Sequence, residues 1–166
     1  MRKIICFHNP DEPNGYLGNW YLSAFELDGI SYSSMEQYMM YQKAVLFGDD
    51  DIARQILETS DVGKIKALGR MVKGYDDRIW NGLRQLIVSK GLFGKFSQNE
   101  ELKKALLDTG DSILAECAVQ DKIWGIGLSM KDDRCYDMDA WQGQNLLGFS
   151  LMYVRTELAG GAGMME

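Results

Sequence analysis

The run from Asp121 to Leu128 (DKIWGIGL) combines a carboxylate, a large aromatic side chain and two glycines within eight residues. Asp121 could handle a proton or a ribose hydroxyl, and the indole of Trp124 could stack on a heterocyclic base. Glycine lets a backbone come close to a ligand. The run suits neither a helix face nor an ordinary strand, so we expect a loop. A loop packed only by its own tryptophan is the alternative.

Glu36 and Lys43 are the second candidate pair. Glu36 completes a Ser33-x-x-Glu pattern that is typical of a capping box, and this role alone would explain it. Residues seven apart share one helix face, about two turns from each other. A carboxylate and an ammonium group on that face could bind a polar ligand or act on it as acid and base. A surface ion pair is the alternative.

Two further positions pair an aromatic ring with a cation. Trp80 and Arg84 lie one helical turn apart, where the indole could stack on a heterocycle while the guanidinium holds a phosphate. A core tryptophan covered by the arginine would look the same. Lys95 beside Phe96 indicates either a phosphate-binding lysine next to a stacking ring or a plain helix entry.

The elements that must hold these residues are mostly helical. A hairpin is expected around Asp28-Gly29, which suits a type I′ turn. The chain predicts strands at 3–7, 24–27, 30–33 and 113–117, and helices at 33–47, 49–58, 61–71, 77–92, 97–109 and 144–158, the fifth opening with a second capping box. In the helix over 77–92, the side chains at helical spacing are Ile79, Leu83, Leu86, Ile87 and Lys90.

These elements predict an α+β fold, a single mostly helical domain with a small β-sheet over residues 1–159. Residues 160–166 are rich in glycine, and we expect a disordered tail there. At 166 residues, with 46% hydrophobic and 25% charged residues, the composition is that of an ordinary globular domain. No apolar run reaches membrane-spanning length, and the N-terminal apolar stretch is too short for a signal peptide.

Charge and composition exclude several function classes. A net charge of −6 argues against sequence-independent binding of nucleic acid and favours a small substrate. Cys6, Cys117 and Cys135 have no CxxC spacing, which argues against a disulfide framework or a zinc site and favours a reducing cytoplasm. His8 is the only histidine, and no GxSxG, Walker A or dinucleotide-binding glycine motif is present. We expect neither a metal nor a cofactor.

Several segments of the chain form a set whose order is informative. They are Tyr16–Tyr21, Ser34–Tyr38 with Gln42–Ala44, Trp80–Arg84, Lys95–Asn99, Leu106–Asp111, Glu116, Asp121–Gly127 and Trp141–Gly148 through Arg155. This ordered set resembles the NADAR family, also called YbiA-like. Gly18 stands where a serine is commoner in the family, and Val119-Gln120 stands where members often carry a proline.

This resemblance implies a YbiA-like fold and an N-glycosidase that cleaves the C1–N bond between a ribose phosphate and an amine. The implied substrates are ribosylamino-pyrimidine phosphates, which are early intermediates of riboflavin biosynthesis, or ADP-ribose attached to guanine in nucleic acid. The family's active-site positions correspond to Glu36, Trp80, Asp121 and Trp124.

We therefore expect a carboxylate role for Glu36 and positioning of water or a ribose hydroxyl by Asp121. Lys43 would form a Schiff base with the opened sugar or tune Glu36 by its charge. The alternative is a non-catalytic module that binds ADP-ribose or a related nucleotide. No membrane partner is expected, and the sequence indicates no oligomeric state. The expected substrate-binding residues are Asn19, Trp80, Arg84, Lys95, Trp124 and Arg155.

Overall fold

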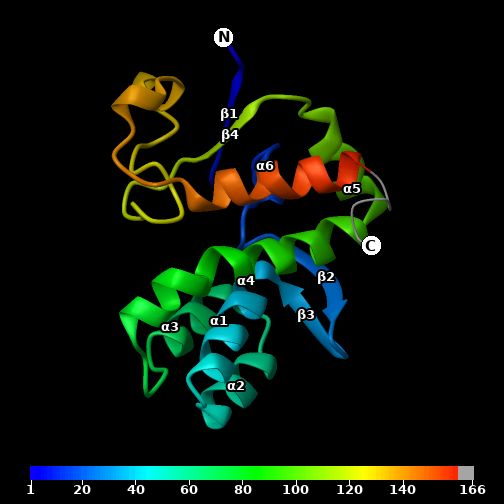
Figure 1. Ribbon diagram of the computed structural model, residues 1–166, viewed down its shortest axis with the longest axis vertical. Coiled ribbons are helices and arrows are strands. Elements are labelled where there is room, and N and C mark those ends of the chain that lie inside the picture. The colour runs from blue at the N-terminus through cyan, green and yellow to red at the C-terminus, as the bar shows by residue number, and fades with distance from the viewer. Residues whose placement is uncertain (161–166) are drawn as a thin grey trace. The chain divides into compact units, whose positions relative to one another are not determined.

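The computed structural model describes residues 1–160, which form two compact units (Figure 1). The second unit is one continuous stretch, Asn19–Lys95, whereas the first combines Met1–Gly18 with the chain from Phe96 onward. Apart from Gly160, the predicted disordered tail lies outside the described residues.

The second unit opens with an antiparallel hairpin of β2 (Leu22–Leu27) and β3 (Ile30–Ser34). Asp28 and Gly29 connect the strands with φ angles of 52° and 81°. Positive φ at both central residues is what a type I′ turn requires, so the predicted hairpin is confirmed. β3 runs directly into α1 (Met35–Leu46).

The start of α1 differs from the predicted capping box by one residue. Ser34, not Ser33, precedes the helix, and its hydroxyl accepts a hydrogen bond from the Gln37 N–H at 3.1 Å. The carboxamide oxygen of Gln37 accepts the Ser33 N–H at 2.7 Å. The side chain that reaches back across the helix start is therefore that of Gln37, and the capping-box role predicted for Glu36 is wrong.

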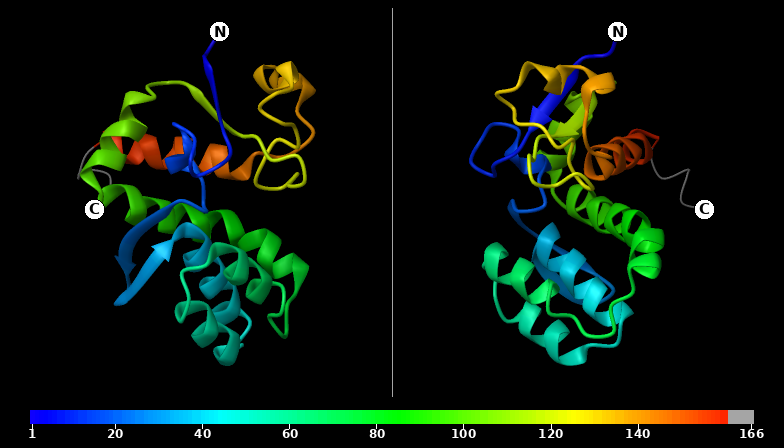
Figure 2. Two further views of the ribbon diagram at one scale, coloured as in Figure 1. Left: turned by 180° about the vertical axis from the view of Figure 1, so that it is seen from behind. Right: turned by 90° about the vertical axis from the view of Figure 1, so that its left-hand side faces the viewer.

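Two short helices follow, and both begin at an aspartate. The Asp49 carboxylate accepts the Ile52 N–H at the start of α2 (Asp50–Leu57), and Asp61 accepts the Lys64 N–H at the start of α3 (Val62–Gly69). Such caps satisfy amide groups that have no partner within the helix. Both predicted helices are confirmed, and both pack against α1 (Figure 2).

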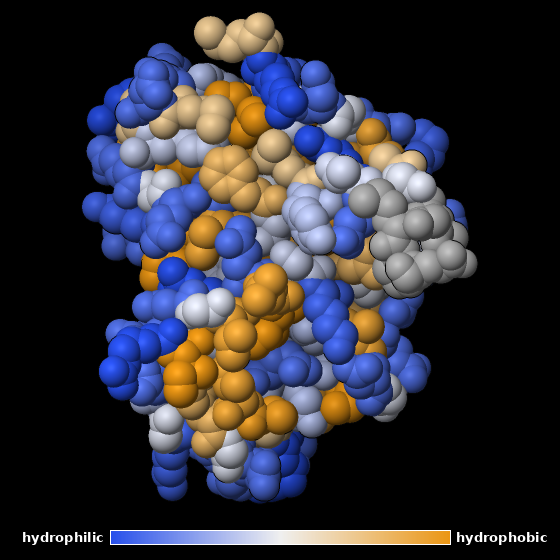
Figure 3. Space-filling view, viewed as in Figure 1, coloured by the Kyte–Doolittle hydropathy of each residue, from blue (hydrophilic) through white to orange (hydrophobic). Residues whose placement is uncertain are grey.

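The long helix α4 (Asp77–Ser97) extends five residues beyond its predicted end at Leu92. It packs tightly on α1, because a Cβ added at Gly91 would lie 2.3 Å from the ring of Tyr38. The buried side chains of α4 include Trp80, Arg84 and Val88. The predicted apolar set instead has three exposed members, Ile79, Leu83 and Leu86. Apolar side chains gather on the surface over α4 (Figure 3).

The first unit is built on a parallel pair of strands, β1 (Ile4–Phe7) and β4 (Ile113–Glu116), with Ile4 opposite Ile113. The buried side chain of Asn145 binds β4 as well: its Oδ1 accepts the Glu116 N–H at 3.0 Å, and its Nδ2 donates to the Leu114 carbonyl at 2.8 Å. The small β-component therefore consists of two separate two-stranded sheets among the described residues.

Two helices complete the first unit. α5 (Glu100–Asp108) starts after Asn99, whereas Ser97 belongs to α4, so the predicted second capping box is wrong. α6 (Leu146–Ala159) packs on β4 so closely that a Cβ at Gly148 would meet the Leu114 carbonyl oxygen (Figure 2). Short 3-10 turns occur at Gly15–Leu17, Asp133–Tyr136 and Met138–Ala140. Within residues 1–160, no helix has the length and apolar character needed to cross a membrane.

Candidate active site

Glu36 is the second residue of α1, and only 4% of it is exposed. Its backbone N–H donates to the carbonyl of Asn19 at 2.9 Å, which brings Asn19 next to the first turn of the helix. The partial positive charge at a helix N-terminus favours an ionised carboxylate there. The structure therefore brings together one predicted catalytic residue, Glu36, and one predicted substrate-binding residue, Asn19.

Two of the predicted substrate-binding residues carry buried polar atoms without a partner. Within the described chain, neither Oδ1 of Asn19 nor Nε of Arg84 makes a hydrogen bond. The other end of the guanidinium is fixed, because Nη1 donates to Oδ1 of Asn81 at 2.7 Å. Unpaired buried polar atoms are rare in folded proteins, because each costs about 1–3 kcal/mol. One acceptor and one donor are thus available to a ligand.

The amine of Lys43 is half-buried and held in place. It donates to the carbonyl of Gly69 at 2.9 Å and lies 4.6 Å from the ring centroid of Tyr75. Burial, followed by the nearby charge of Arg70, lowers the pKa of Lys43, and the charge of Glu36 acts in the opposite direction. A lowered pKa increases the share of neutral amine, the form needed for nucleophilic attack.

Tyr75 is a site neighbour that the sequence analysis missed. Its hydroxyl donates to Asp77 at 2.6 Å, and its ring lies beside the Lys43 amine. Burial and then the Asp77 hydrogen bond raise the pKa of Tyr75 to about 12, against the opposing charge of Arg84. Tyr75 therefore connects the surroundings of Lys43 to Asp77, the first residue of α4. Nothing in its sequence context, a loop between two helices, distinguishes it from an ordinary surface tyrosine.

The other polar residues of α1 have structural partners. Gln37 donates to two carbonyls, those of Ile56 and Thr59, and so connects α1 to the end of α2. The Tyr38 hydroxyl donates to the Ile87 carbonyl at 2.8 Å. Their presence on a core helix is thus explained by packing between elements.

Lys95 lies in the last turn of α4, so the helix-entry explanation for it is wrong. Its side chain is fully buried, its amine lies 5.5 Å from the Tyr21 ring centroid, and burial lowers its pKa to about 7. Eleven helical residues separate it from Arg84, which is roughly 16 Å along the axis. The structure does not bring these two cations together.

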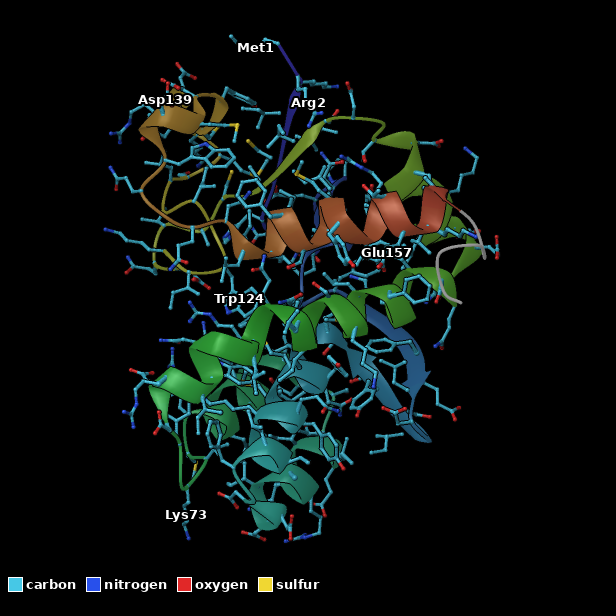
Figure 4. All side chains as sticks on the ribbon, viewed as in Figure 1. Met1, Arg2, Lys73, Trp124, Asp139 and Glu157 are labelled. Carbon is cyan, nitrogen blue, oxygen red and sulfur yellow. The ribbon has the colours of Figure 1, made fainter. Side chains whose placement is uncertain are left out.

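The run from Asp121 forms the expected loop, and hydrogen bonds define its shape. Oδ1 of Asp121 accepts the N–H groups of Ile123 and Trp124, both at 2.9 Å. The first amides of α6 donate back to the loop, including Leu147 N–H to the Trp124 carbonyl at 3.2 Å. Figure 4 labels Trp124 in this position. The loop is therefore not held by the tryptophan ring alone. Backbone hydrogen bonds and one carboxylate oxygen of Asp121 also fix its shape.

Arg155 lies farther along α6. Its guanidinium is buried and donates to the Thr109 hydroxyl at 2.8 Å, and burial lowers its pKa. It follows Leu147 by eight residues, or roughly 12 Å of helix. It therefore lies beside the end of α5 and away from the Trp124 loop.

An open cavity of about 520 Å³ in the first unit contains none of these residues. It lies beside Arg2 and Asp139 (Figure 4) and is lined mainly by apolar side chains, including Ile4 and Tyr136. The candidate residues fall into two groups, one in each unit. Asn19, Glu36, Lys43, Trp80, Arg84 and Lys95 belong to the second unit, and Asp121, Trp124 and Arg155 to the first.

Comparison with known proteins places the chain in a family. Residues 6–159 match the NADAR domain. The chain belongs to the NADAR family. This confirms the resemblance found in the sequence, and the match covers both groups of candidate residues.

Two relatives of this NADAR chain carry names that state an activity or a biosynthetic role. It is 46% identical over 163 residues to "N-glycosidase R617" of Acanthamoeba polyphaga mimivirus, which covers 93% of this chain and 96% of that protein. It is 32% identical to "Riboflavin biosynthesis protein VVA0006" of Vibrio vulnificus (strain YJ016), over 95% of this chain and 39% of that longer protein. These names agree with the predicted enzyme class.

A solved structure has the same fold. The NMR structure of the E. coli protein YbiA matches with a TM-score of 0.79 and 27% identity, over 95% of this chain and 86% of that one. The predicted YbiA-like α+β fold is therefore confirmed.

Proposed function

We propose that this N-glycosidase hydrolyses the C1–N bond of a ribosylamino-pyrimidine phosphate, with Glu36 as the catalytic carboxylate. The observation that carries the proposal is the buried Glu36 beside Asn19, whose Oδ1 has no partner within the described chain. A ribose hydroxyl can donate to such an acceptor. The riboflavin-related name of the Vibrio relative supports the choice of substrate.

Cleavage of this bond builds positive charge on C1 and on the ring oxygen of the ribose. A buried carboxylate near C1 lowers the energy of that charged state, because its charge is poorly screened there. Water then adds its oxygen to C1, and its two protons end on the new hydroxyl and on the departing amine. Glu36 would hold the attacking water and accept its proton. The role that we propose for Asp121 is to orient a water molecule or a ribose hydroxyl.

The remaining candidates would bind the two ends of the substrate. Trp80 and Trp124 offer flat apolar faces for the heterocycle or the ribose. Arg84 presents an unpaired buried Nε–H, which suits a phosphate or carbonyl oxygen. Lys95 would donate to a phosphate oxygen. Arg155 already donates a hydrogen bond to the Thr109 hydroxyl. It would therefore contact a phosphate only if that phosphate also lay beside Thr109.

Lys43 provides a second route for the same reaction. Opening of the ribose to an imine would expose C1 to a neutral lysine amine, which displaces the substrate amine and forms a Schiff base that water then hydrolyses. Borohydride added during turnover would trap this adduct. The trapped mass should disappear in Lys43→Ala, and an active enzyme that never gives an adduct would leave direct hydrolysis as the mechanism.

A substrate panel tests the activity itself. The full chain is incubated with a ribosylamino-pyrimidine phosphate, with NAD and with DNA carrying ADP-ribosylated guanine, and released base and sugar phosphate are quantified. We expect the highest kcat/KM for the pyrimidine compound. Tight binding of ADP-ribose without release of any base would instead favour the non-catalytic reader.

The Glu36 assignment is tested by exchanging only its charge. Glu36→Gln should lower kcat/KM by about 10²–10⁴-fold with little change in Tm. Glu101→Gln is the matched control, because Glu101 is also the second residue of a helix but is exposed. Near-full activity of Glu36→Gln would contradict the proposal.

A further inference from the structure

The three cysteines of the chain form a cluster in the first unit. Cys6 lies in β1, Cys117 directly follows β4, and Cys135 lies in the 3-10 turn Asp133–Tyr136. Their sulfur atoms all lie within 4.8 Å of one another, and all three side chains are buried. Segments far apart in sequence thus converge on one point, and no CxxC spacing reveals it.

The fold fixes the positions of these thiols. Cys6 lies opposite Ala115 in the parallel pair, and Cys117 is two residues farther, so its side chain is on the same face of the strand. The Cys117 N–H donates to the Phe7 carbonyl at 2.8 Å. The Trp141 indole donates to the Cys135 carbonyl at 2.9 Å, which anchors the third segment.

The surroundings of the cluster are apolar. The thiols pack with Ala115, Ile126 and Leu128, and Ile4 and Met130 lie against them. Among the histidine, cysteine and acidic side chains of the described residues, no fourth group joins the three sulfurs. Zinc is usually held by four ligands, whereas soft sulfur ligands in an apolar setting also select Cu(I).

We propose that Cys6, Cys117 and Cys135 form a binding site for one soft, sulfur-seeking metal ion, with Cu(I) as the ion that fits best. A three-sulfur shell needs each S···S separation to be about 4 Å for metal–sulfur bonds of about 2.3 Å, so small side-chain shifts suffice. Binding replaces the thiol protons, which pass to the solvent, and no electron is transferred. Ile4 packs against the thiol cluster and also lines the open cavity, so the ion would enter from that side.

The test is a titration of the full, reduced chain with Cu(I) under anaerobic conditions, against a coloured Cu(I) chelator. We expect one ion per chain and a rise in Tm, because an ion that binds the folded state stabilises it. Cys117→Ser and Cys135→Ser should each weaken binding by more than the roughly 10–100-fold that loss of an outer-shell contact costs.

Ile126→Val is the matched control, because it disturbs the same core but keeps all three thiols. It should bind Cu(I) with unchanged stoichiometry. The proposal would be overturned if Cys135→Ser still held Cu(I) against the chelator. It would also be overturned if the parent chain could not take Cu(I) from the chelator. Recovery of a single titratable thiol from the freshly prepared anaerobic protein would overturn it too, because a disulfide would leave too few ligands.

Discussion

At the scale of single residues, Lys95 combines full burial with an ionisable amine. A fully buried ammonium is costly, and burial lowers the pKa of Lys95 to about 7 from an ordinary value near 10.4. Between these two pKa values the unfolded chain binds a proton that the folded chain does not. Stability should therefore rise with pH across this window, and the penalty is complete below about pH 7.

Lys95→Met should remove this pH dependence, because methionine does not titrate. We expect the free energy of unfolding of the variant, relative to that of the parent, to fall by about 2–4 kcal/mol between pH 7 and pH 9.5. Urea denaturation at pH 7 and 9.5 measures it. Lys90→Met is the control on the same helix, because Lys90 is exposed and pairs with Asp28 on the surface. A difference between Lys95→Met and the parent that is independent of pH would contradict the assignment. Loss of substrate affinity in Lys95→Met would support a phosphate-binding role.

Asp121 has two separable roles, because one carboxylate oxygen already organises its loop. Asp121→Asn keeps an oxygen that can accept the Ile123 and Trp124 amides but removes the charge, whereas Asp121→Ala removes both. We expect Asp121→Asn to keep its Tm and to lose roughly tenfold or more in kcat/KM. Asp121→Ala should also lose about 1–2 kcal/mol of stability. Full activity of Asp121→Asn would contradict the catalytic role and leave Asp121 with only its structural role in the loop.

At the scale of elements, α4 shows how a helix depends on the size of single side chains. Gly91 faces the Tyr38 ring with no room for a Cβ, whereas Gly82 on the same helix faces open space. Gly91→Ala should therefore cost about 1–3 kcal/mol through overpacking. Gly82→Ala should raise the free energy of unfolding by about 0.5–1 kcal/mol, because alanine has a higher helix propensity than glycine. Thermal unfolding of both variants measures the difference, and equal effects would contradict this packing.

The elements differ in how well the sequence predicts them. The β2–β3 hairpin and the aspartate-capped helices α2 and α3 depend on local turn and cap chemistry, and these predictions are confirmed. The burial of α4 was not predictable, because periodicity shows which residues share a face but not which face packs. Glu36 lost its predicted cap role for a related reason: adjacent serines at 33 and 34 offer two helix starts, and only the structure distinguishes them.

At the scale of the whole molecule, the net charge of −6 bears on the choice of substrate. A basic nucleic-acid enzyme loses about 10³–10⁵ in affinity between 50 and 200 mM salt. For this acidic chain, we expect kcat/KM on ADP-ribosylated DNA to change by less than about tenfold over that range, and kcat/KM on the pyrimidine phosphate to change little. Steady-state rates at both salt concentrations provide the test. A much steeper loss of kcat/KM on DNA would indicate a local basic surface that contacts phosphates despite the negative net charge.

The candidate site was predictable mainly as residue types. Glu36, Trp80, Asp121 and Trp124 stand in motifs, so the sequence and the family resemblance could propose them. Tyr75 and the unpaired atoms of Asn19 and Arg84 could not be foreseen, because they depend on which tertiary neighbours are present. The convergence of the cysteines likewise depends on pairing between distant strands.

The parallel pairing of β1 with β4 has a consequence for the order of events during synthesis. Ile4 leaves the ribosome about a hundred residues before its partner Ile113, and the whole stretch Asn19–Lys95 is made between them. Closing so long a loop costs entropy, and contacts between distant residues slow folding. The strand pairing β2–β3 is local and needs no such wait. Glu36 and Asn19 can thus be organised while the ribosome is still adding the residues that will form the Asp121 loop.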